Sequence, residues 1–131
     1  MYEMKKEYFT GIQIVDEEHA KLFEYANQIY ELLNEEFMVD KYDNIKDLLI
    51  KLKDYAKVHF ADEEAYMESI QYKKIFTQKV QHQAFIDALE EYDLDEIDQM
   101  EDQDAVISKM LTFVTDWLVD HILNLDTQIG K

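Results

Sequence analysis

Four histidines and two acids are the side chains of this sequence whose types and spacing suit chemistry at a metal ion. Glu63 follows His59 by four residues, so the two side chains lie on one face of a helix. Asp126 follows His121 by five residues, which is about 140° of helical rotation, so Asp126 must reach round from the end of its helix, for which a local distortion is one means. Imidazole and carboxylate ligands without sulfur suit iron, and less specifically manganese or zinc. The candidate metal ligands are His19, His59, Glu63, His82, His121 and Asp126.

Apolar residues recur at helical spacing in four stretches, and each stretch carries one of the histidines. The stretches run over residues 19–33, 45–66, 75–89 and 107–121. Each predicts a helix of about 20 residues, and Asp16 is placed to act as the N-cap of the first. Short connections near residues 38–41 and 69–71 make sequential helices antiparallel neighbours. The sequence therefore predicts an all-α, antiparallel up-down-up-down four-helix bundle, with the first ~15 residues as an N-terminal arm.

The alternating direction of the helices brings the histidines to one end of this bundle. His19 lies near the start of its helix, whereas His59 lies towards the end of the next. His82 and His121 repeat this alternation, so all four imidazoles are expected towards the same end. One buried histidine is most often a satisfied core residue, but four at a common level favour a metal centre.

The composition of the chain excludes several classes of partner and ligand. It has 13 basic and 30 acidic residues, a net charge of −17, so it repels nucleic acids and anionic lipid. It has no cysteine, which excludes thiolate ligands, disulfides and iron–sulfur clusters. No signal-peptide core opens the chain, and no apolar run of about 20 residues could span a bilayer. We expect one cytoplasmic domain over residues 1–131, a monomer or weak homo-oligomer without a membrane partner.

The acidic stretch at residues 90–104 holds nine acids and no basic residue, and it raises a second metal hypothesis. Asp93 and Asp95 have the first spacing of an EF-hand calcium loop. However, Ile97 stands where a third oxygen ligand belongs, and Asp98 stands where that loop needs glycine. We therefore interpret the stretch as a solvated connection between the third and fourth helices.

Four short blocks carry the most specific pattern in the sequence. They are residues 14–23, residues 59–64 followed by Met67 and Tyr72, His82 with Phe85, and residues 117–122 with Asp126. In their order and spacing these blocks resemble those of the bacterial hemerythrins, and the resemblance covers residues 11–126. It implies a four-helix bundle, as the periodicity does.

The resemblance also implies a dioxygen-binding protein with a non-haem di-iron centre. The family holds its two irons, which share an oxo or hydroxo bridge, with five histidines and two bridging carboxylates. By match, one iron would take His19 and His59, the other His82 and His121, and Glu63 and Asp126 would bridge them. Leu118 would line the oxygen pocket, and the apolar shell around the pocket would keep it dry.

One position departs from the family pattern. The fifth histidine of the family lies four residues before the one that matches His82, and this chain has Gln78 there. The same-face spacing is retained, but a neutral amide is a weaker ligand than imidazole. Either Gln78 ligates through its carbonyl oxygen, or water fills the position, or the second iron keeps an open site.

Three functions follow from these alternatives. The first is reversible binding of dioxygen for storage, delivery, transport or sensing, without catalytic residues. The second is a di-iron oxidoreductase that reduces peroxide or oxygen, which Gln78 favours because an open site lets peroxide approach the iron. The third is a metal-free or differently metallated bundle that acts as an interaction module. We expect the first.

Overall fold

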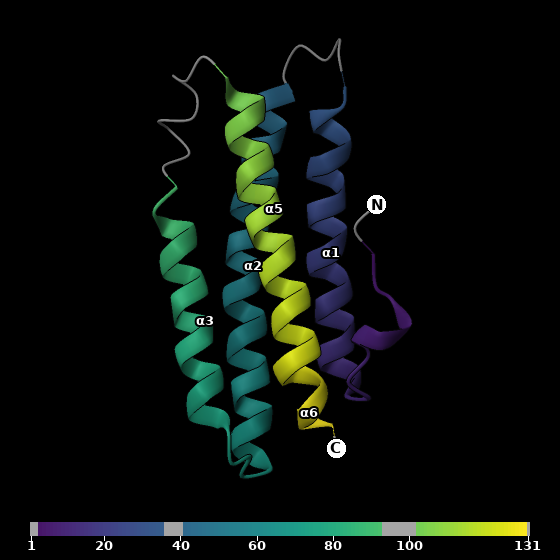
Figure 1. Cartoon of the computed structure of the whole chain (residues 1–131), viewed down its shortest axis with the longest axis vertical. Coiled ribbons are helices and arrows are strands. Elements are labelled where there is room, and N and C mark those ends of the chain that lie inside the picture. The colour runs from purple at the N-terminus through teal and green to yellow at the C-terminus, as the bar shows by residue number, and fades with distance from the viewer. Residues whose placement is uncertain (1–2, 36–40, 93–101, 131) are drawn as a thin grey trace.

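The computed structural model describes residues 3–35, 41–92 and 102–130, and these residues form helices joined by short loops. The long helices are α1 (Gln13–Leu33), α2 (Lys41–Ser69), α3 (Ile75–Glu90) and α5 (Gln103–His121). They run alternately up and down, as Figure 1 shows, and the described residues contain no strand. The predicted all-α, antiparallel four-helix bundle is confirmed.

Three short elements complete the described chain. A 3-10 turn, η1 (Lys6–Tyr8), lies in the N-terminal arm. After α5 the backbone continues through one π-helical turn, η2 (Ile122–Asp126), into α6 (Thr127–Ile129). The C-terminal end of the chain lies at the same end of the bundle as the start of α1 and the turn between α2 and α3 (Figure 1). This end carries the candidate ligands.

Periodic burial of apolar side chains, uninterrupted by proline, explains the long helices. In α1 and α5 the buried apolar side chains include those of Leu22, Phe23, Ala26, Ile29, Ile107, Met110 and Val114. Each set recurs every three or four residues, so it forms one stripe that faces the other helices. The expected length of about 20 residues holds for α1 and α5, whereas α2 has 29 residues and α3 has 16.

The N-cap predicted at Asp16 is wrong, because α1 begins earlier, at Gln13, with Ile12 as the N-cap residue. The Asp16 carboxylate instead accepts hydrogen bonds from the backbone N–H and the hydroxyl of Thr10, at 2.8 and 2.9 Å. It also accepts one from the backbone N–H of Gly11 at 3.1 Å. Gly11 has a φ of 86°, a left-handed conformation that glycine adopts without steric cost. Asp16 therefore fastens the N-terminal arm to α1.

Two apolar clusters enclose the level of the bundle at which the candidate ligands lie. The main core runs between the long helices and includes residues of all four. The second cluster consists of Ile12, Val15, Met67 and Ile129. Val15 lies one turn before His19 and Met67 lies one turn after Glu63, so this cluster closes the bundle beyond the ligands. Apolar side chains therefore separate the ligand level from solvent at that end.

The described loops agree with the short turns expected. The turn between α2 and α3 follows Ser69 and contains Gln71, whose φ is 54°, and the backbone N–H of Tyr72 closes it on Met67 O at 2.9 Å. α5 begins at an aspartate N-cap, because the Asp102 carboxylate accepts a hydrogen bond from the backbone N–H of Ala105 at 3.1 Å. The calcium-loop positions at residues 93–98, and most of the connections predicted at 90–104 and 38–41, lie outside the described residues.

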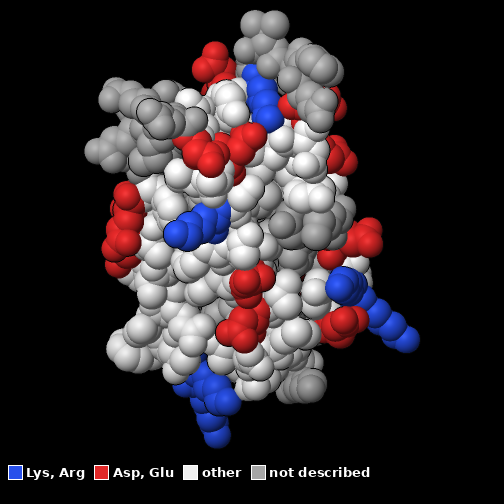
Figure 2. Space-filling view, turned by 45° about the horizontal axis from the view of Figure 1, so that its top comes forward, with Lys and Arg blue, Asp and Glu red and all other residues white. Residues whose placement is uncertain are grey.

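Acidic side chains are spread over the surface. Figure 2 shows them scattered across the face in view, with a few basic side chains between them, in keeping with the net charge of −17. On the face in view, the basic side chains of the described residues stand apart from one another. In the described parts of the chain, no helix combines the length and the apolar character that crossing a membrane requires.

Replacing Asp16 with alanine should loosen the N-terminal arm and destabilise the protein by about 1–3 kcal/mol, because three hydrogen bonds to one carboxylate are lost. Urea unfolding monitored by circular dichroism measures this loss. Glu17→Ala is the matched control, since Glu17 is an exposed neighbour whose bond to Gln13 stays within α1. It should change the unfolding free energy by less than about 0.5 kcal/mol. Equal effects of the two variants would contradict the role of Asp16.

Candidate metal centre

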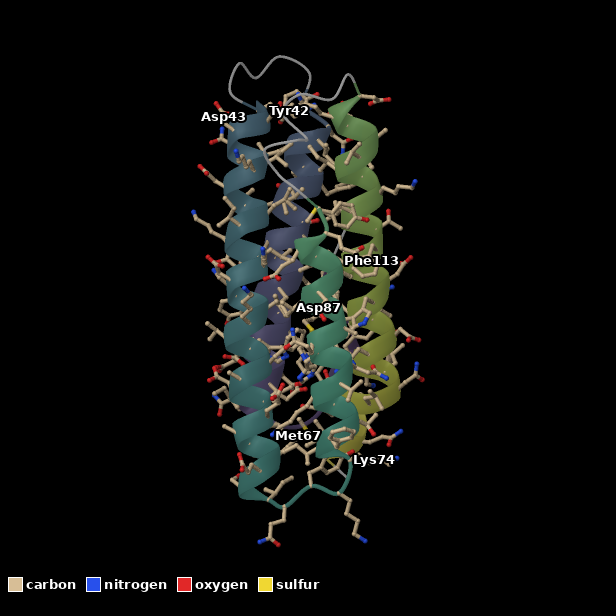
Figure 3. All side chains as sticks on the ribbon, turned by 90° about the vertical axis from the view of Figure 1, so that its left-hand side faces the viewer. Tyr42, Asp43, Met67, Lys74, Asp87 and Phe113 are labelled. Carbon is tan, nitrogen blue, oxygen red and sulfur yellow. The ribbon has the colours of Figure 1, made fainter. Side chains whose placement is uncertain are left out.

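The candidate ligands come from all four long helices and from the turn after α5. α1 supplies His19, α2 supplies His59 and Glu63, α3 supplies His82, α5 ends at His121, and η2 ends at Asp126. All six residues are buried, with at most 3 % of their surface exposed. Figure 3 shows nitrogen and oxygen atoms gathered in the interior of the bundle, between the levels of the labelled Asp87 and Met67. The structure thus brings the six side chains together at one level.

The π-helical turn η2 explains how residues five apart face the same point. In a π turn the backbone hydrogen bond joins residues i and i+5, so these residues become neighbours instead of being separated by about 140° of rotation. His121 immediately precedes η2, and Asp126 ends it. As a result, His121 Nε2 lies 3.1 Å from Asp126 Oδ1. A local distortion, the π turn, is therefore the means by which Asp126 reaches round to His121.

Two sets of four ligand atoms form within this cluster, and both carboxylates belong to each set. The first set is His19, His59, Glu63 and Asp126, and the second is Glu63, His82, His121 and Asp126. In each set the four ligand atoms lie within 4.8 Å of one another. The histidines are paired in the same way as the family resemblance implies.

The Glu63 carboxylate turns one oxygen towards each set. Its Oε2 lies 3.3 Å from His59 Nε2 and 3.6 Å from His19 Nε2. Its Oε1 lies 3.3 Å from His82 Nε2. One carboxylate therefore faces imidazoles of both sets, which is the orientation that a bridge between two ions needs.

The Asp126 carboxylate is oriented in the same manner. Its Oδ2 lies 3.1 Å from His19 Nε2, and its Oδ1 lies 3.1 Å from His121 Nε2. Two ligand atoms that are each about 2.1 Å from one ion lie about 3.0–3.4 Å apart at ordinary coordination angles. Four of the five nitrogen–oxygen separations given above are 3.1–3.3 Å and fall within this range. The atoms are therefore spaced as neighbours around a shared cation.

The donor atoms also lack the partners that a metal-free core would give them. In the described part of the chain, the buried atoms without a hydrogen bond include both His19 ring nitrogens, both Glu63 oxygens and Asp126 Oδ2. His82 Nε2 and His121 Nε2 lie 3.2 Å apart, and only one proton fits between two such nitrogens. Buried polar atoms are normally paired, so a cation is the partner that this arrangement suits.

Three of the imidazoles are held by a hydrogen bond on the outer nitrogen. The pairs are His59 Nδ1 with Glu18 Oε1 at 2.9 Å, His82 Nδ1 with Glu64 Oε2 at 2.8 Å, and His121 Nδ1 with Gln81 Oε1 at 2.9 Å. An acceptor on Nδ1 fixes the tautomer and points the Nε2 lone pair towards the metal position. Sequence reasoning missed these partners. Each is adjacent to a candidate ligand in the sequence, but each pairs with a histidine of another helix, which only the packing reveals.

In the metal-free protein, protons offset the buried negative charge. Burial alone would lower the pKa of His59, but its hydrogen bond to Glu18 and its close contact with the Glu63 carboxylate outweigh burial and raise that pKa to about 9. Burial also opposes protonation of His19, yet contacts with Asp126 and Glu63 raise its pKa. The pKa of Glu63 lies well below its usual range, because the facing imidazoles outweigh the burial that would raise it. A bound cation would displace these protons.

Aromatic rings pack against the second set of ligands. The rings of Phe60 and His82 are stacked, with centroids 4.0 Å apart and planes at 8°. Trp117 stacks on His121 with centroids 4.5 Å apart and planes at 11°. Leu118, the residue expected to line an oxygen pocket, is buried in the main core one turn before His121. The second set therefore borders apolar surface.

Gln78 occupies the position at which the family carries its fifth histidine. It lies one turn before His82 on the same face of α3 and is fully buried. Its Nε2 donates a hydrogen bond to Asp126 Oδ1 at 3.0 Å. The side chain therefore contacts a carboxylate that both sets share.

Comparison with known proteins agrees with this geometry. The family model of the hemerythrin HHE cation binding domain matches residues 10–130. This chain belongs to the hemerythrin family. It is 50 % identical over 128 residues to the bacteriohemerythrin of Clostridium acetobutylicum, a match that covers 98 % of each chain. It is 30 % identical over 117 residues to the bacteriohemerythrin of Pseudomonas paraeruginosa, which covers 89 % of this chain and 71 % of that protein.

A more distant relative is the hemerythrin subunit alpha of Lingula reevii, which is 27 % identical over 117 residues, or 89 % of this chain and 82 % of that protein. Membership of the hemerythrin family confirms the predicted resemblance. It also confirms the predicted class of function, an oxygen-binding protein with non-haem iron. The cation-binding character of the matched domain agrees with the two clusters of imidazoles and carboxylates in the bundle.

The metal-free hemerythrin domain should be most stable between about pH 5 and 6.5. His59 has a raised pKa in the fold, so its contribution is complete below its unfolded value of 6.5 and is lost as the pH rises through about 9. Glu63 has a lowered pKa, so its contribution is present above 4.5 and is lost as the pH falls further. Urea unfolding of chelator-treated protein should show a loss of about 3 kcal/mol between pH 6 and pH 10.

The metal-loaded protein supplies the contrast for this measurement. Bound cations require neutral imidazoles, so its stability should rise with pH from 6 to 8, where fewer protons compete for the ligands. Metal-free protein whose stability also rises between pH 6.5 and pH 9 would contradict the protonation described for His59.

Proposed function

We propose that this hemerythrin binds dioxygen reversibly at a non-haem centre of two iron ions. One ion would be held by His19 and His59 and the other by His82 and His121, with Glu63 and Asp126 shared between them. The observation that carries the proposal is the pair of buried carboxylates, each of which turns one oxygen towards each set of imidazoles. Imidazole and carboxylate donors without sulfur suit iron.

The surroundings of the ligands support binding of a small apolar molecule with water kept away. The second apolar cluster closes the bundle beyond the ligands, and the aromatic side chains of Phe60 and Trp117 pack against two of the imidazoles. When bound, iron would supply the electrons and the Lewis acidity that dioxygen binding requires. The apolar shell restricts access of solvent, which favours release of oxygen unchanged over irreversible oxidation.

The outer hydrogen bonds support a preformed centre. Glu18, Glu64 and Gln81 accept from the outer ring nitrogens, so the imidazoles are oriented before any ion binds. A carboxylate partner also raises the basicity of the imidazole that donates to it. Two of the three partners are carboxylates, one beside each set. The chain's own side chains therefore provide orientation and charge for both ions.

The remaining predictions extend this proposal. We propose that residues 1–131 form a single hemerythrin-like domain, which the match of the family model to residues 10–130 supports. A cytoplasmic location, a monomeric or weakly oligomeric state and the pocket role of Leu118 stay predictions. The alternative, a di-iron oxidoreductase that acts on peroxide or oxygen, is not favoured over oxygen binding by the relatives found.

Anaerobic loading with ferrous iron tests the two parts of the proposal. We expect two iron ions per chain in a colorimetric assay, because two sets of ligands share the carboxylates. We also expect a visible absorption band that appears when oxygen is added and disappears when oxygen is removed. Fewer than two ions per chain would contradict the two-ion centre. A stable ferric spectrum that persists after removal of oxygen would contradict reversible binding and support the oxidoreductase.

Replacing Glu63 with glutamine should reduce the iron content below one ion per chain, since this carboxylate belongs to both sets. The oxygen-dependent absorption band should be lost with it. Glu68→Gln is the matched control, because it removes the same charge from an exposed position on the same helix, and it should retain two ions. Circular dichroism verifies that both variants are helical. A folded Glu63→Gln protein with two ions would remove Glu63 from the ligand set.

A further inference from the structure

The amide of Gln78 lies fully buried beside a shared carboxylate, and its two polar atoms are in different situations. Its Nε2 donates to Asp126 Oδ1 at 3.0 Å. Its Oε1 has no hydrogen-bond partner among the described residues. Both atoms are bonded to one carbon, so Oε1 lies no more than about 5.6 Å from the same Asp126 oxygen. Gln78 therefore contacts the candidate centre through its amide nitrogen, while its amide oxygen lies buried nearby without a hydrogen-bond partner among the described residues.

Hydrogen-bond chemistry determines which amide atom faces Asp126. An ionised carboxylate only accepts hydrogen bonds, and the amide nitrogen is the only donor that Gln78 has in its side chain. Turning the amide over would place two oxygens about 3 Å apart and leave the N–H group buried without an acceptor, which costs about 1–3 kcal/mol. Metal ions are ligated by the amide oxygen, not by the N–H group. The atom that faces the shared carboxylate is therefore not a ligand.

Asp126 is restrained by fewer imidazoles than the other shared carboxylate. Three imidazole nitrogens lie within 3.6 Å of the Glu63 carboxylate, whereas two lie within that distance of Asp126. Asp126 also ends a π turn, while Glu63 lies within a long regular helix. The hydrogen bond from Gln78 supplies the third contact of the Asp126 carboxylate.

The start of α3 is well placed to hold this contact. Gln78 lies in the first helical turn, where its backbone N–H donates to Lys74 O at 3.2 Å. Lys74 Nζ in turn donates to Gln128 Oε1 at 3.0 Å, and Gln128 lies in α6, two residues after Asp126. Figure 3 labels Lys74 at this end of the bundle. The beginning of α3 and the segment that carries Asp126 are therefore joined at two points.

We propose that Gln78 is a positioning residue for Asp126 and not a substitute ligand for the fifth histidine of the family. Its N–H group holds Oδ1 of Asp126 so that this oxygen faces His121 and the other faces His19. The effect of Gln78 on metal binding rests on the proposed two-ion centre, whereas the hydrogen bond between Gln78 and Asp126 needs no metal. The position of the fifth histidine is then left to a small molecule such as water, and Gln78 Oε1 is the buried acceptor for its O–H group.

Replacement of Gln78 by glutamate distinguishes a positioning residue from a ligand by the sign of the effect. Glutamate has the same shape but offers no N–H donor when ionised, so it places two carboxylates side by side. If the native amide ligates through oxygen, a carboxylate there is a stronger ligand for a cation and affinity rises. If the amide positions Asp126, affinity falls. Gln78→Leu has neither an N–H donor for Asp126 nor an oxygen ligand, so it gives the reference affinity without either function.

The affinity is measured with zinc, which is redox-silent, by competition with a chromophoric chelator at pH 7.5. We expect Gln78→Glu and Gln78→Leu to bind the weaker of two zinc ions about 10–100-fold less tightly than the unaltered chain, the effect typical of lost partners of metal ligands. Gln83→Glu is the matched control, since Gln83 is an exposed glutamine on the same helix that bonds Asp87. It should change affinity less than threefold. Equal or tighter binding by folded Gln78→Glu would overturn the proposal.

Nuclear magnetic resonance of the metal-free protein tests the hydrogen bond without relying on any variant's ability to bind metal. The Gln78 side-chain amide should exchange with solvent at least tenfold more slowly than that of Gln83, and Asp126→Ala should abolish the difference. Rapid exchange in the unaltered chain would overturn the proposal even if the zinc affinities change. If the unaltered chain binds fewer than two zinc ions while the amide is protected, the proposed two-ion centre fails and the positioning of Asp126 stands.

Discussion

Attraction between two buried carboxylates and four buried imidazoles is the interaction on which this bundle depends. Glu63 and Asp126 are each 1 % exposed, and an uncompensated carboxylate in such a place costs several kcal/mol. Protons on His19 and His59 supply compensation in the metal-free protein, because contacts with the carboxylates raise the pKa of both imidazoles and lower that of Glu63. Cations supply it when metal is bound. Folding, protonation and metal binding therefore act on the same few atoms.

This requirement accounts for the irregular parts of an otherwise regular bundle. The π turn η2 exists where His121 and Asp126 must face one point, at the place where α5 would otherwise turn the acid away. The N-terminal arm, fastened by Asp16, brings Ile12 into the apolar cluster that covers this end of the bundle. Both features serve the position and the dryness of the ligands.

The two halves of the centre have different surroundings although they share their carboxylates. In the first set, Glu18 is a carboxylate partner of His59, whereas the outer nitrogen of His19 has no hydrogen-bond partner in the part of the chain that the structure describes. In the second set both imidazoles have partners, aromatic rings stack on them, and Gln78 contacts the shared Asp126. Outer partners and nearby apolar surface tune the basicity and solvent access of a metal site. Two ions held here would therefore be chemically unequal even though each has two histidines.

Local sequence patterns by themselves determined the helices, their antiparallel order, the common level of the histidines and the six candidate ligands. Helical periodicity and the four-residue spacing of His59 and Glu63 act within one helix, so they can be read without knowing what that helix packs against. The five-residue spacing likewise showed that Asp126 must reach round from the end of its helix, but it did not specify the π turn by which it does so.

Only the tertiary structure decided the true start of α1, the π turn, the partners of the outer imidazole nitrogens and the contact of Gln78 with Asp126. Glu18 meets His59 across 41 residues, and Gln78 meets Asp126 across 48. Such contacts depend on how far each helix is rotated about its axis and shifted along its neighbour. Those two quantities are set by the packing of whole apolar faces, which no local spacing in the sequence specifies.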